Sequence, residues 1–266
     1  MEITIEYNIS AGKNIEKKYQ NRNKYKSKIN GLEKAIQKTK QQLENLDKEI
    51  SEKKQEKISE KKQEKKEWYH KFRWFFTSNG YLTIGGRDAK NNELLVKKYM
   101  EDSDLYFHAD ISGAAHVVLK NPEKKEIPEE DKQEAAHFAG IYSSAWKSGL
   151  YAVDVYSVLP EQVSKTPEPG EYVGKGAFII RGKKTYYKKM ELKMSFVYDE
   201  EKGIMACPFS YITHKNKTEA ITLIPGNKTK TETAKYIQSF FLKKGIDIST
   251  DEIISLLPPG EFEIQK

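Results

Sequence analysis

The chain has 266 residues, of which 37% are apolar, 32% charged and 11% aromatic. A charged share above the usual quarter means that part of the chain faces solvent, whereas the aromatic residues require a core elsewhere. No apolar run approaches the ~20 residues needed to cross a bilayer, and the start, residues 1–7, lacks the apolar region of a signal peptide. The single cysteine, Cys207, excludes an internal disulfide, so a reducing compartment such as the cytosol is expected.

The net charge of +7 is unevenly distributed. Residues 13–66 carry 18 Lys/Arg against 9 Asp/Glu, and the rest of the chain carries 28 against 30. The basic character therefore belongs to an N-terminal arm, and this excess favours a polyanionic partner. A solvated helix face is the alternative.

The arm begins with residues 3–7, whose apolar and polar residues alternate as in a short strand. Residues 13–76 contain no proline and a single glycine, Gly31, which predicts a long helix. Its large residues step by three and four in a heptad seam typical of a coiled coil. The seam consists of Ile29, Leu32, Ile36, Thr39, Leu43, Leu46 and Ile50. A continuous helix and a hairpin with its turn in residues 45–55 both remain open.

The composition changes at Trp68, so we expect two domains, residues 1–67 and 68–266. The aromatic run WYHKFRWFF, residues 68–76, is expected to pack in a core, with stacking on RNA as the alternative. Short strands then alternate with a few helices, which predicts an α+β domain with a compact mixed sheet. Strands are expected at 81–85, 104–109, 115–119, 151–158, 177–181, 185–188, 192–198, 203–206 and 219–224, with one more at the C-terminus. Helices are expected at 88–100, 129–147, 208–214, 230–243 and 249–256.

A glycine pair follows the strand at 81–85, in the segment GGRDAKNNE. Gly86 has no side chain and would let a neighbouring group approach the backbone closely. Asp88 can cap the next helix. Arg87 would then lie beside a helix N-terminus, where a phosphate is favoured. The alternative is a capped helix with Arg87 in an internal salt bridge. The GxGxxG spacing of a dinucleotide site is absent.

In the segment DLYFHADISGAAH, Asp104, His108 and Asp110 share one face of a predicted strand because they are an even number of residues apart. Such a set could bind a metal or act as acid and base. The spacing matches no common metal signature, so we expect a hydrogen-bonded or RNA-contacting cluster, with no metal and no catalytic residue.

The densest basic region of the second domain lies in residues 162–189. Its cations can neutralise phosphates, and its tyrosines can stack on unpaired bases. Its members are Lys165, Lys175, Arg181, Lys183, Lys184, Lys188 and Lys189, with Tyr172, Tyr186 and Tyr187. An edge hairpin protected by lysines is the alternative.

The chain contains no nucleophile elbow, P-loop, kinase motif or CxxC pair. Cys207 lies in the apolar segment IMACPF and is expected in the core. The sequence thus indicates a binding protein that is not an enzyme and needs neither a cofactor nor a small-molecule substrate.

Three segments together resemble the NFACT family, which includes the fibronectin-binding-A-like proteins of bacteria and archaea and the eukaryotic nuclear export mediator factor. They are FRWFFTSNGYLTIGGRDAKNNELLVKKY, DLYFHADISGAAHVVLKN and QVSKTPEPGEYVGKGAFIIRGKK. Residues 68–193 resemble the RNA-binding R domain of the family, and the remainder resembles the C-terminal continuation of archaeal members. The arm resembles the coiled-coil middle domain, which in the family is an antiparallel hairpin.

The resemblance implies a role on the ribosome. Full-length members bind the large ribosomal subunit with stalled peptidyl-tRNA and support untemplated C-terminal tailing of the nascent chain. Their N-terminal tRNA-engaging domain is expected to be missing here, so tailing is not expected of this chain alone. The implied partners are large-subunit rRNA and tRNA in the cytoplasm, with no membrane. The predicted RNA-contacting residues are Gly86, Arg87, Asp88, His108, Asp110, Lys165, Arg181, Lys183 and Lys184.

Two other functions stay open. An RNA-processing or tRNA-modifying enzyme could be centred on His108 and Asp110. Alternatively, the coiled coil could bind a protein partner and make the chain an interaction scaffold.

Overall fold

The computed structural model divides the chain into two compact units, residues 1–66 and 67–266. In the described part of the chain, no helix is both long and apolar enough to span a membrane. The structure describes residues 6–61, 67–167, 173–216 and 219–265. For residues 44–61 it describes the backbone but not the side chains.

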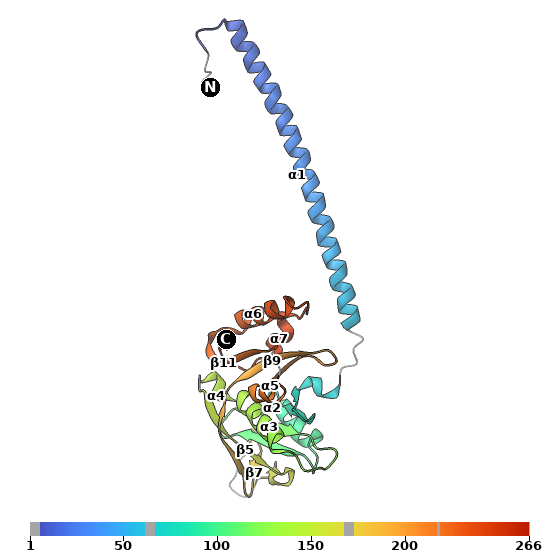
Figure 1. The fold of residues 1–266 in the computed structure, drawn as a ribbon, viewed down its shortest axis with the longest axis vertical. Coiled ribbons are helices and arrows are strands. Elements are labelled where there is room, and N and C mark those ends of the chain that lie inside the picture. Colours follow the sequence, from blue (N-terminus) through green and yellow to red (C-terminus); the bar gives the residue numbers. More distant parts are fainter. Residues whose placement is uncertain (1–5, 62–66, 168–172, 217–218, 266) are drawn as a thin grey trace. The chain divides into compact units, whose positions relative to one another are not determined.

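The first unit consists of a turn at residues 6–10 and one helix, α1 (Ala11–Lys61) (Figure 1). Asn14 Oδ1 accepts a hydrogen bond from Glu6 N at 2.9 Å and holds the turn against the first helical residues. The strand predicted at 3–7 begins outside the described residues, and its end lies in this turn. The helix runs without a break through 45–55, so the hairpin that the family resemblance implied is not observed in the described residues.

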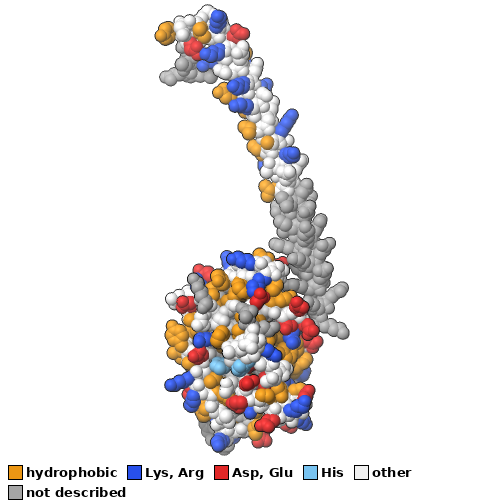
Figure 2. Space-filling model, in the orientation of Figure 1, with side chains coloured by type: hydrophobic (Ala, Val, Ile, Leu, Met, Phe, Trp, Pro, Cys, Tyr) orange, Lys and Arg blue, Asp and Glu red, His pale blue; other side chains and the backbone are white. Residues whose placement is uncertain are grey.

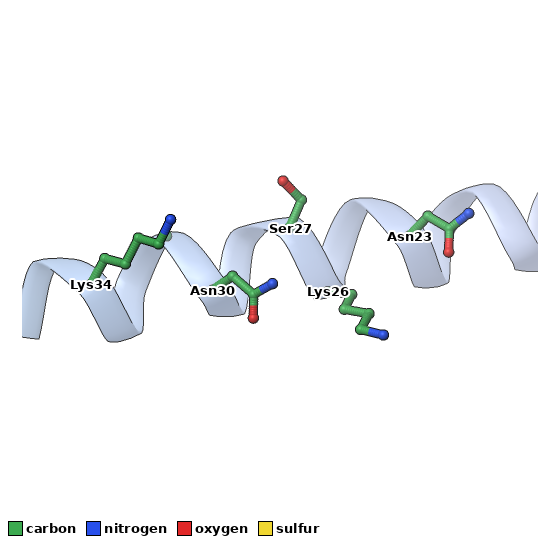
Figure 3. Close-up of a pocket in the computed structure, with 6 residues that line it drawn as sticks. Asn23, Lys26, Ser27, Asn30 and Lys34 are labelled. Atoms are coloured by element: carbon green, nitrogen blue, oxygen red, sulfur yellow. The ribbon is translucent and has the colours of Figure 1, made fainter.

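The apolar seam of α1 is exposed. Seven large side chains are each 54–62% accessible, and apolar atoms follow the described part of the helix in Figure 2. They are Ile29, Leu32, Ile36 and Leu43 of the seam, together with Ile15, Tyr19 and Tyr25 nearer the start of the helix. Another face of the helix has a shallow depression over Gly31, lined by polar side chains (Figure 3). The seam therefore has no cover within the described part of this unit.

Two sheets and a ribbon form the second unit. The larger sheet has the order β1-β2-β4-β3-β5-β8, the smaller β10-β9-β11-β12, and the ribbon β6-β7. All pairings among the described strands are antiparallel, so the α+β class is confirmed and the mixed sheet is wrong. The strands are β1 (Arg73–Phe76), β2 (Leu82–Gly85), β3 (Leu105–Ala109), β4 (Val117–Leu119), β5 (Ala152–Val158), β6 (Val163–Ser164), β7 (Ile179–Ile180), β8 (Thr185–Glu191), β9 (Met194–Asp199), β10 (Gly203–Pro208), β11 (Ile221–Lys228) and β12 (Phe262–Gln265).

Helices connect and cover these strands (Figure 1). The α-helices are α2 (Ala89–Leu94), α3 (Glu129–Ile141), α4 (Ser144–Lys147), α5 (Phe209–His214), α6 (Lys230–Leu242) and α7 (Thr250–Leu256). The remaining turns are the 3-10 helices η1 (Trp68–Lys71) and η3 (Pro160–Gln162) and the π-helix η2 (Leu95–Tyr99). The predicted strands and helices of this unit are confirmed to within a few residues, with two exceptions. The predicted helix at 88–100 is α2 followed by the π-helix η2, and the predicted helix at 129–147 is divided into α3 and α4.

Strand β1 was not predicted, because the aromatic run that forms it does not alternate with polar residues. Phe72, Trp74 and Phe75 are buried, which confirms core packing for this run. Trp68 is instead 40% exposed and stacks on Tyr99 with their ring centroids 4.7 Å apart.

Helix α3 covers one face of the larger sheet. The Phe138 ring packs 4.8 Å from that of Phe75, and a side chain at Gly140 would approach Val153 to 3.1 Å. Burial of this face stabilises the unit by roughly 25 cal/mol for each Å² of apolar surface removed from water. On the opposite face, Tyr106, His116 and Tyr156 are buried, and exposure rises at the edge strand β8, where Tyr186 is 43% exposed.

The two sheets share one core. Two residues separate the end of β8 from the start of β9. The Tyr142 hydroxyl donates to the Leu256 carbonyl at 2.7 Å, and Trp146 Nε1 donates to the Glu261 carbonyl at 3.1 Å. Cys207 is buried in this core, as predicted, and burial raises the pKa of its thiol.

Candidate nucleic-acid interface

One face of the larger sheet carries a row of rings. His108, Tyr156 and Tyr186 stand opposite one another in register on β3, β5 and β8. The ring centroids are 5.9 Å apart for His108 and Tyr156, and 6.0 Å apart for Tyr156 and Tyr186. The row continues from His108 to His116 at 4.9 Å and on to Phe178 at 5.3 Å. These five residues are called the ring row.

The alternation of side chains along each strand separates the ring row from the core. Phe107 and Tyr187, the sequence neighbours of His108 and Tyr186, point to the face that α3 covers, and their rings pack 5.8 Å apart. Within the row, Tyr156 is 6% exposed and Tyr186 is 43% exposed. The ring row is therefore open to solvent at the edge strand β8.

Three basic residues each place an ammonium group over a ring of the row. The distances from Nζ to the ring centroid are 5.1 Å for Lys165 over Phe178, 3.9 Å for Lys184 over Tyr156 and 4.4 Å for Lys188 over Tyr186. Lys188 also pairs with Asp154 at 2.8 Å. Lys184 has no hydrogen bond or ion pair with any residue that the structure describes. Of the three, Lys184 is thus the most available for a phosphate.

Lys165 holds the segment before β7. Its Nζ donates to the carbonyls of Gly174 (2.8 Å) and Ala177 (2.9 Å). Because an ammonium group has three N–H donors, one remains for a ligand. Lys165 therefore adds positive charge beside the ring row while positioning the loop that carries Phe178.

The two imidazoles of the ring row are neutral at neutral pH. Burial lowers the pKa of His116 to about 3, and the positive charge of Lys165, and of His108 when it is protonated, acts in the same direction. Burial also lowers the pKa of His108, and Lys184 adds to this effect. His116 Nδ1 is 2.6 Å from the Tyr106 hydroxyl, which fixes its orientation. The histidines thus behave as uncharged rings, and the lysines supply the charge.

The turn at residues 85–88 (GGRD) packs beside the start of β4, next to His116 of the ring row. A side chain at Gly86 would lie 1.9 Å from Asn92 Oδ1, so only glycine fits there. That same amide oxygen accepts a hydrogen bond from His116 N at 3.2 Å. Asp88 caps α2, as predicted, by accepting from Asn91 N at 2.9 Å. The glycine and the cap therefore hold α2 against the strand end that carries His116.

Arg87 makes contacts within the unit. Its Nη2 donates to the carbonyls of Phe72 (3.1 Å) and His70 (3.4 Å). These contacts tie the turn after β2 to the segment before β1. They leave its predicted contact with RNA untested.

Asp104 does not join His108 and Asp110, contrary to the shared face predicted for the three residues. It lies just before β3, fully buried, and pairs with Lys120 at 2.6 Å while accepting from Asn121 N at 2.9 Å. A buried carboxylate is stable only with such partners. Asp110 instead lies exposed just after β3, where its backbone N–H donates to the Asp154 carbonyl at 2.8 Å.

The two remaining predicted residues, Arg181 and Lys183, lie at the turn after β7. Gln162 Nε2 donates to their carbonyls at 2.7 and 3.0 Å, and Gly182 between them has φ +81°. The side chain of Lys183 is exposed. Gln162 therefore positions the turn that leads to Lys184, a role that the sequence did not indicate.

The sequence reasoning missed four members of this surface: His116, Tyr156, Phe178 and Gln162. Tyr156 lies within the strand predicted at 151–158, so its place on a sheet was predictable. No sequence spacing could place Phe178, because a loop brings it to the row. Tyr172 falls outside the described residues. No group of three or more His, Cys, Asp or Glu side chains that could hold a metal occurs in the described ranges.

The sequence pattern of the NFACT protein RNA binding domain matches residues 71–182. These residues form an NFACT-R domain. The match contains four of the five members of the ring row, and Tyr186 follows shortly after its end. The resemblance found in the sequence is thereby confirmed for this part of the chain.

Similarity to whole proteins extends further. The archaeal Rqc2 homolog aRqcH of Methanocaldococcus jannaschii is 42% identical over 204 residues, which cover 76% of this chain and 30% of that protein. The ribosome quality control complex subunit NEMF homolog of Drosophila melanogaster is 47% identical over 127 residues, which cover 48% of this chain and 13% of that protein. The chain with its NFACT-R domain is thus a homologue of the Rqc2 and NEMF proteins, and spans less than a third of the length of these two.

Among solved structures, the C-terminal part of the fibronectin/fibrinogen-binding protein from Streptococcus suis is similar, with 24% identity and a TM-score of 0.39. The alignment covers 48% of this chain and 49% of that chain.

Proposed function

We propose that this chain is the RNA-contacting part of a ribosome quality control factor and acts by binding. The relatives are named for ribosome quality control, and the NFACT-R domain is described as RNA binding. The observation that carries the proposal is the ring row, with three lysines over its rings on the sheet face opposite α3.

The surface has the two features that RNA binding requires. Lysine ammonium groups neutralise phosphates and release counterions, which supplies affinity that depends on salt. Exposed rings stack on unpaired bases, which adds affinity with little dependence on sequence. The basic arm, with 18 Lys/Arg against 9 Asp/Glu in residues 13–66, would add attraction to a polyanion.

The finer proposal concerns the ribosome. The target would be the large ribosomal subunit with stalled peptidyl-tRNA, in the cytoplasm, where the whole protein supports untemplated C-terminal tailing of the nascent chain. Because the chain spans 30% of the archaeal relative, tailing would need the remainder of such a protein. In this proposal residues 1–67 are the arm and residues 68–266 the docking domain, with neither catalysis nor a cofactor.

Co-sedimentation with purified large ribosomal subunits tests this proposal. The double variant Lys183→Glu/Lys184→Glu reverses two charges beside the ring row and should weaken binding at least ten-fold at moderate salt. The double variant Lys235→Glu/Lys243→Glu makes the same change in charge at exposed positions in and just after α6, and is the matched control. Equal affinity of the two double variants would contradict the proposed surface. Absence of binding by the unaltered chain would contradict the function.

The exposed seam of α1 supports a second role, the binding of a helical protein partner. Seven large apolar side chains more than half exposed would gain stability from such a partner. Light scattering of the chain with and without RNA tests this role. A mass that stays that of one chain at all concentrations, together with no protein partner recovered through α1, would contradict it.

A further inference from the structure

The first turn of the second unit presents a tryptophan to solvent. Trp68 begins η1 and is 40% exposed, whereas Trp74 and Trp146 are 8% and 1% exposed. Its indole lies parallel to the Tyr99 ring, with 4.7 Å between the ring centroids and 2° between the planes. The indole is therefore held in a fixed orientation by Tyr99, and its exposed part is available for a further ring.

Two exposed lysines lie beside this stack. Lys71 donates a hydrogen bond to the Tyr99 hydroxyl, and its Nζ is 4.1 Å from the centroid of the Tyr99 ring. Lys98 Nζ is 5.9 Å from the same centroid. Within the described ranges neither lysine has an ion pair, and Lys98 has no hydrogen bond. The stack therefore carries two positive charges that no neighbouring carboxylate neutralises.

Helix η1 covers the same face of the larger sheet on which the ring row lies. Its Tyr69 ring packs 5.1 Å from the ring of Trp74 on β1. The registers of β1, β2, β4 and β3 place Trp74 on the same face as Tyr106, which is two residues from His108 of the ring row. Strands β1 and β8 are the two edges of this sheet, about 24 Å apart at the usual strand spacing. One RNA strand can therefore contact both Trp68 and the ring row.

We propose that an unpaired RNA base stacks on Trp68 and extends the pair that Trp68 forms with Tyr99. Lys71 and Lys98 contact the adjoining phosphates. Aromatic rings stack on every base and lysines neutralise phosphates, so the site takes single-stranded RNA with little dependence on sequence. The inference rests on the proposed RNA-binding function and adds a contact outside the ring row. A tryptophan with a structural role alone would affect stability and leave RNA affinity unchanged.

Intrinsic fluorescence of the full chain tests the stack directly. The chain is titrated with oligouridine of about 20 nucleotides, longer than a typical single-stranded site. Because Trp74 and Trp146 are buried, a base that stacks on Trp68 should quench the emission of the exposed indole. Trp68→Phe should abolish this quenching and keep the affinity within about three-fold, since its ring can still stack. Unchanged emission of the unaltered chain with RNA bound would overturn the proposal.

Fluorescence anisotropy with the same strand, labelled at one end, measures the affinity. Trp68→Leu should weaken binding about five-fold or more. Lys98→Gln should lower the dependence of the logarithm of affinity on the logarithm of salt by about 0.7, the contribution of one phosphate contact in a single strand. The matched controls are Tyr198→Leu, at a 38% exposed position of the smaller sheet, and Lys243→Gln, just after α6. Neither control should change affinity or salt dependence in this way.

The outcomes separate this site from the function as a whole. Thermal melting checks the folding of each variant, and the quenching of the unaltered chain decides the question even if Trp68→Leu does not fold. A folded Trp68→Leu variant with unchanged affinity would overturn the proposal. If the strand binds and Tyr186→Leu weakens it while the Trp68 emission stays constant, only this site fails. If no RNA binds, the proposed function itself fails.

Discussion

The two units of this chain place their apolar residues in opposite environments. In α1, side chains such as Leu32 and Ile36 are more than half exposed along a regular seam. In the second unit, side chains such as Phe107, Phe138 and Trp146 are at most 1% exposed. Both units are rich in lysine, yet only the second buries enough apolar surface to account for its own stability.

This difference shows what a hydrophobic pattern can and cannot tell. A heptad seam specifies that a helix has an apolar side, and it leaves the identity of the covering surface open. In the second unit, α3 and the smaller sheet supply that cover from the chain itself.

The largest effect is expected from the core. Phe107→Ala should lower the free energy of unfolding of the second unit by about 3–5 kcal/mol, because it leaves a cavity under α3. Urea unfolding followed by tryptophan fluorescence measures this, since Trp68, Trp74 and Trp146 all lie in the second unit. A loss below about 1 kcal/mol would mean that this part of the core is not packed as described.

The next effect is a pH dependence from His116. Its pKa is about 3 when folded and about 6.5 when unfolded, so the unfolded chain binds more protons between these values and is favoured as the pH falls. One such group should cost about 2 kcal/mol of stability between pH 7 and pH 5. Urea unfolding at the two pH values should show this loss. His116→Gln, which keeps a partner for the Tyr106 hydroxyl, should reduce the loss, and an unchanged loss would contradict the assignment.

A smaller effect is expected when α1 is removed, and it falls on the salt dependence of RNA binding. Without α1, residues 67–266 should still bind structured RNA, with a lower salt slope because the basic arm is gone. In this shortened chain, Lys184→Gln should reduce the slope further by about one phosphate contact, and Lys243→Gln should not. Nitrocellulose-filter binding at several salt concentrations measures the slopes. Loss of all binding on removal of α1 would assign RNA binding to the arm.

The smallest effect is expected from the exposed seam. Leu32→Ser should change the unfolding free energy of the second unit by less than about 0.5 kcal/mol, because the side chain is 62% exposed. Tryptophan fluorescence in urea again reports the second unit alone. A loss comparable with that of Phe107→Ala would show that the seam is buried against the second unit in solution.

Most elements of the second unit were predictable from local patterns. The glycine pair and Asp88 marked the end of β2 and the start of α2, and the alternation in residues 104–109 marked β3. The run at residues 68–76 was predicted to be buried, but it was not recognised as a strand because nearly every residue in it is large. The candidate site was predicted in part: His108, Lys165 and Lys184 meet at the ring row, whereas Arg87 is bonded to backbone carbonyls.

Asp104 and Tyr186 show why the remainder could not be predicted. Both are polar residues in predicted strands, yet one is buried in an ion pair with Lys120 and the other is open to solvent at a sheet edge. Their environments depend on which strands become neighbours, and pairing of β8 with β5 is a contact between distant segments.

The sequence by itself determined the long helix, most strands of the second unit, the capped turn after β2 and the distribution of charge, because these depend on residues close together in the chain. Only the tertiary structure decided that α1 continues without a turn, that α3 covers one face of the larger sheet, and that rings from three strands and a loop form a row on the other. These features depend on strand order and on which surfaces bury one another, and local spacing contains no information about either.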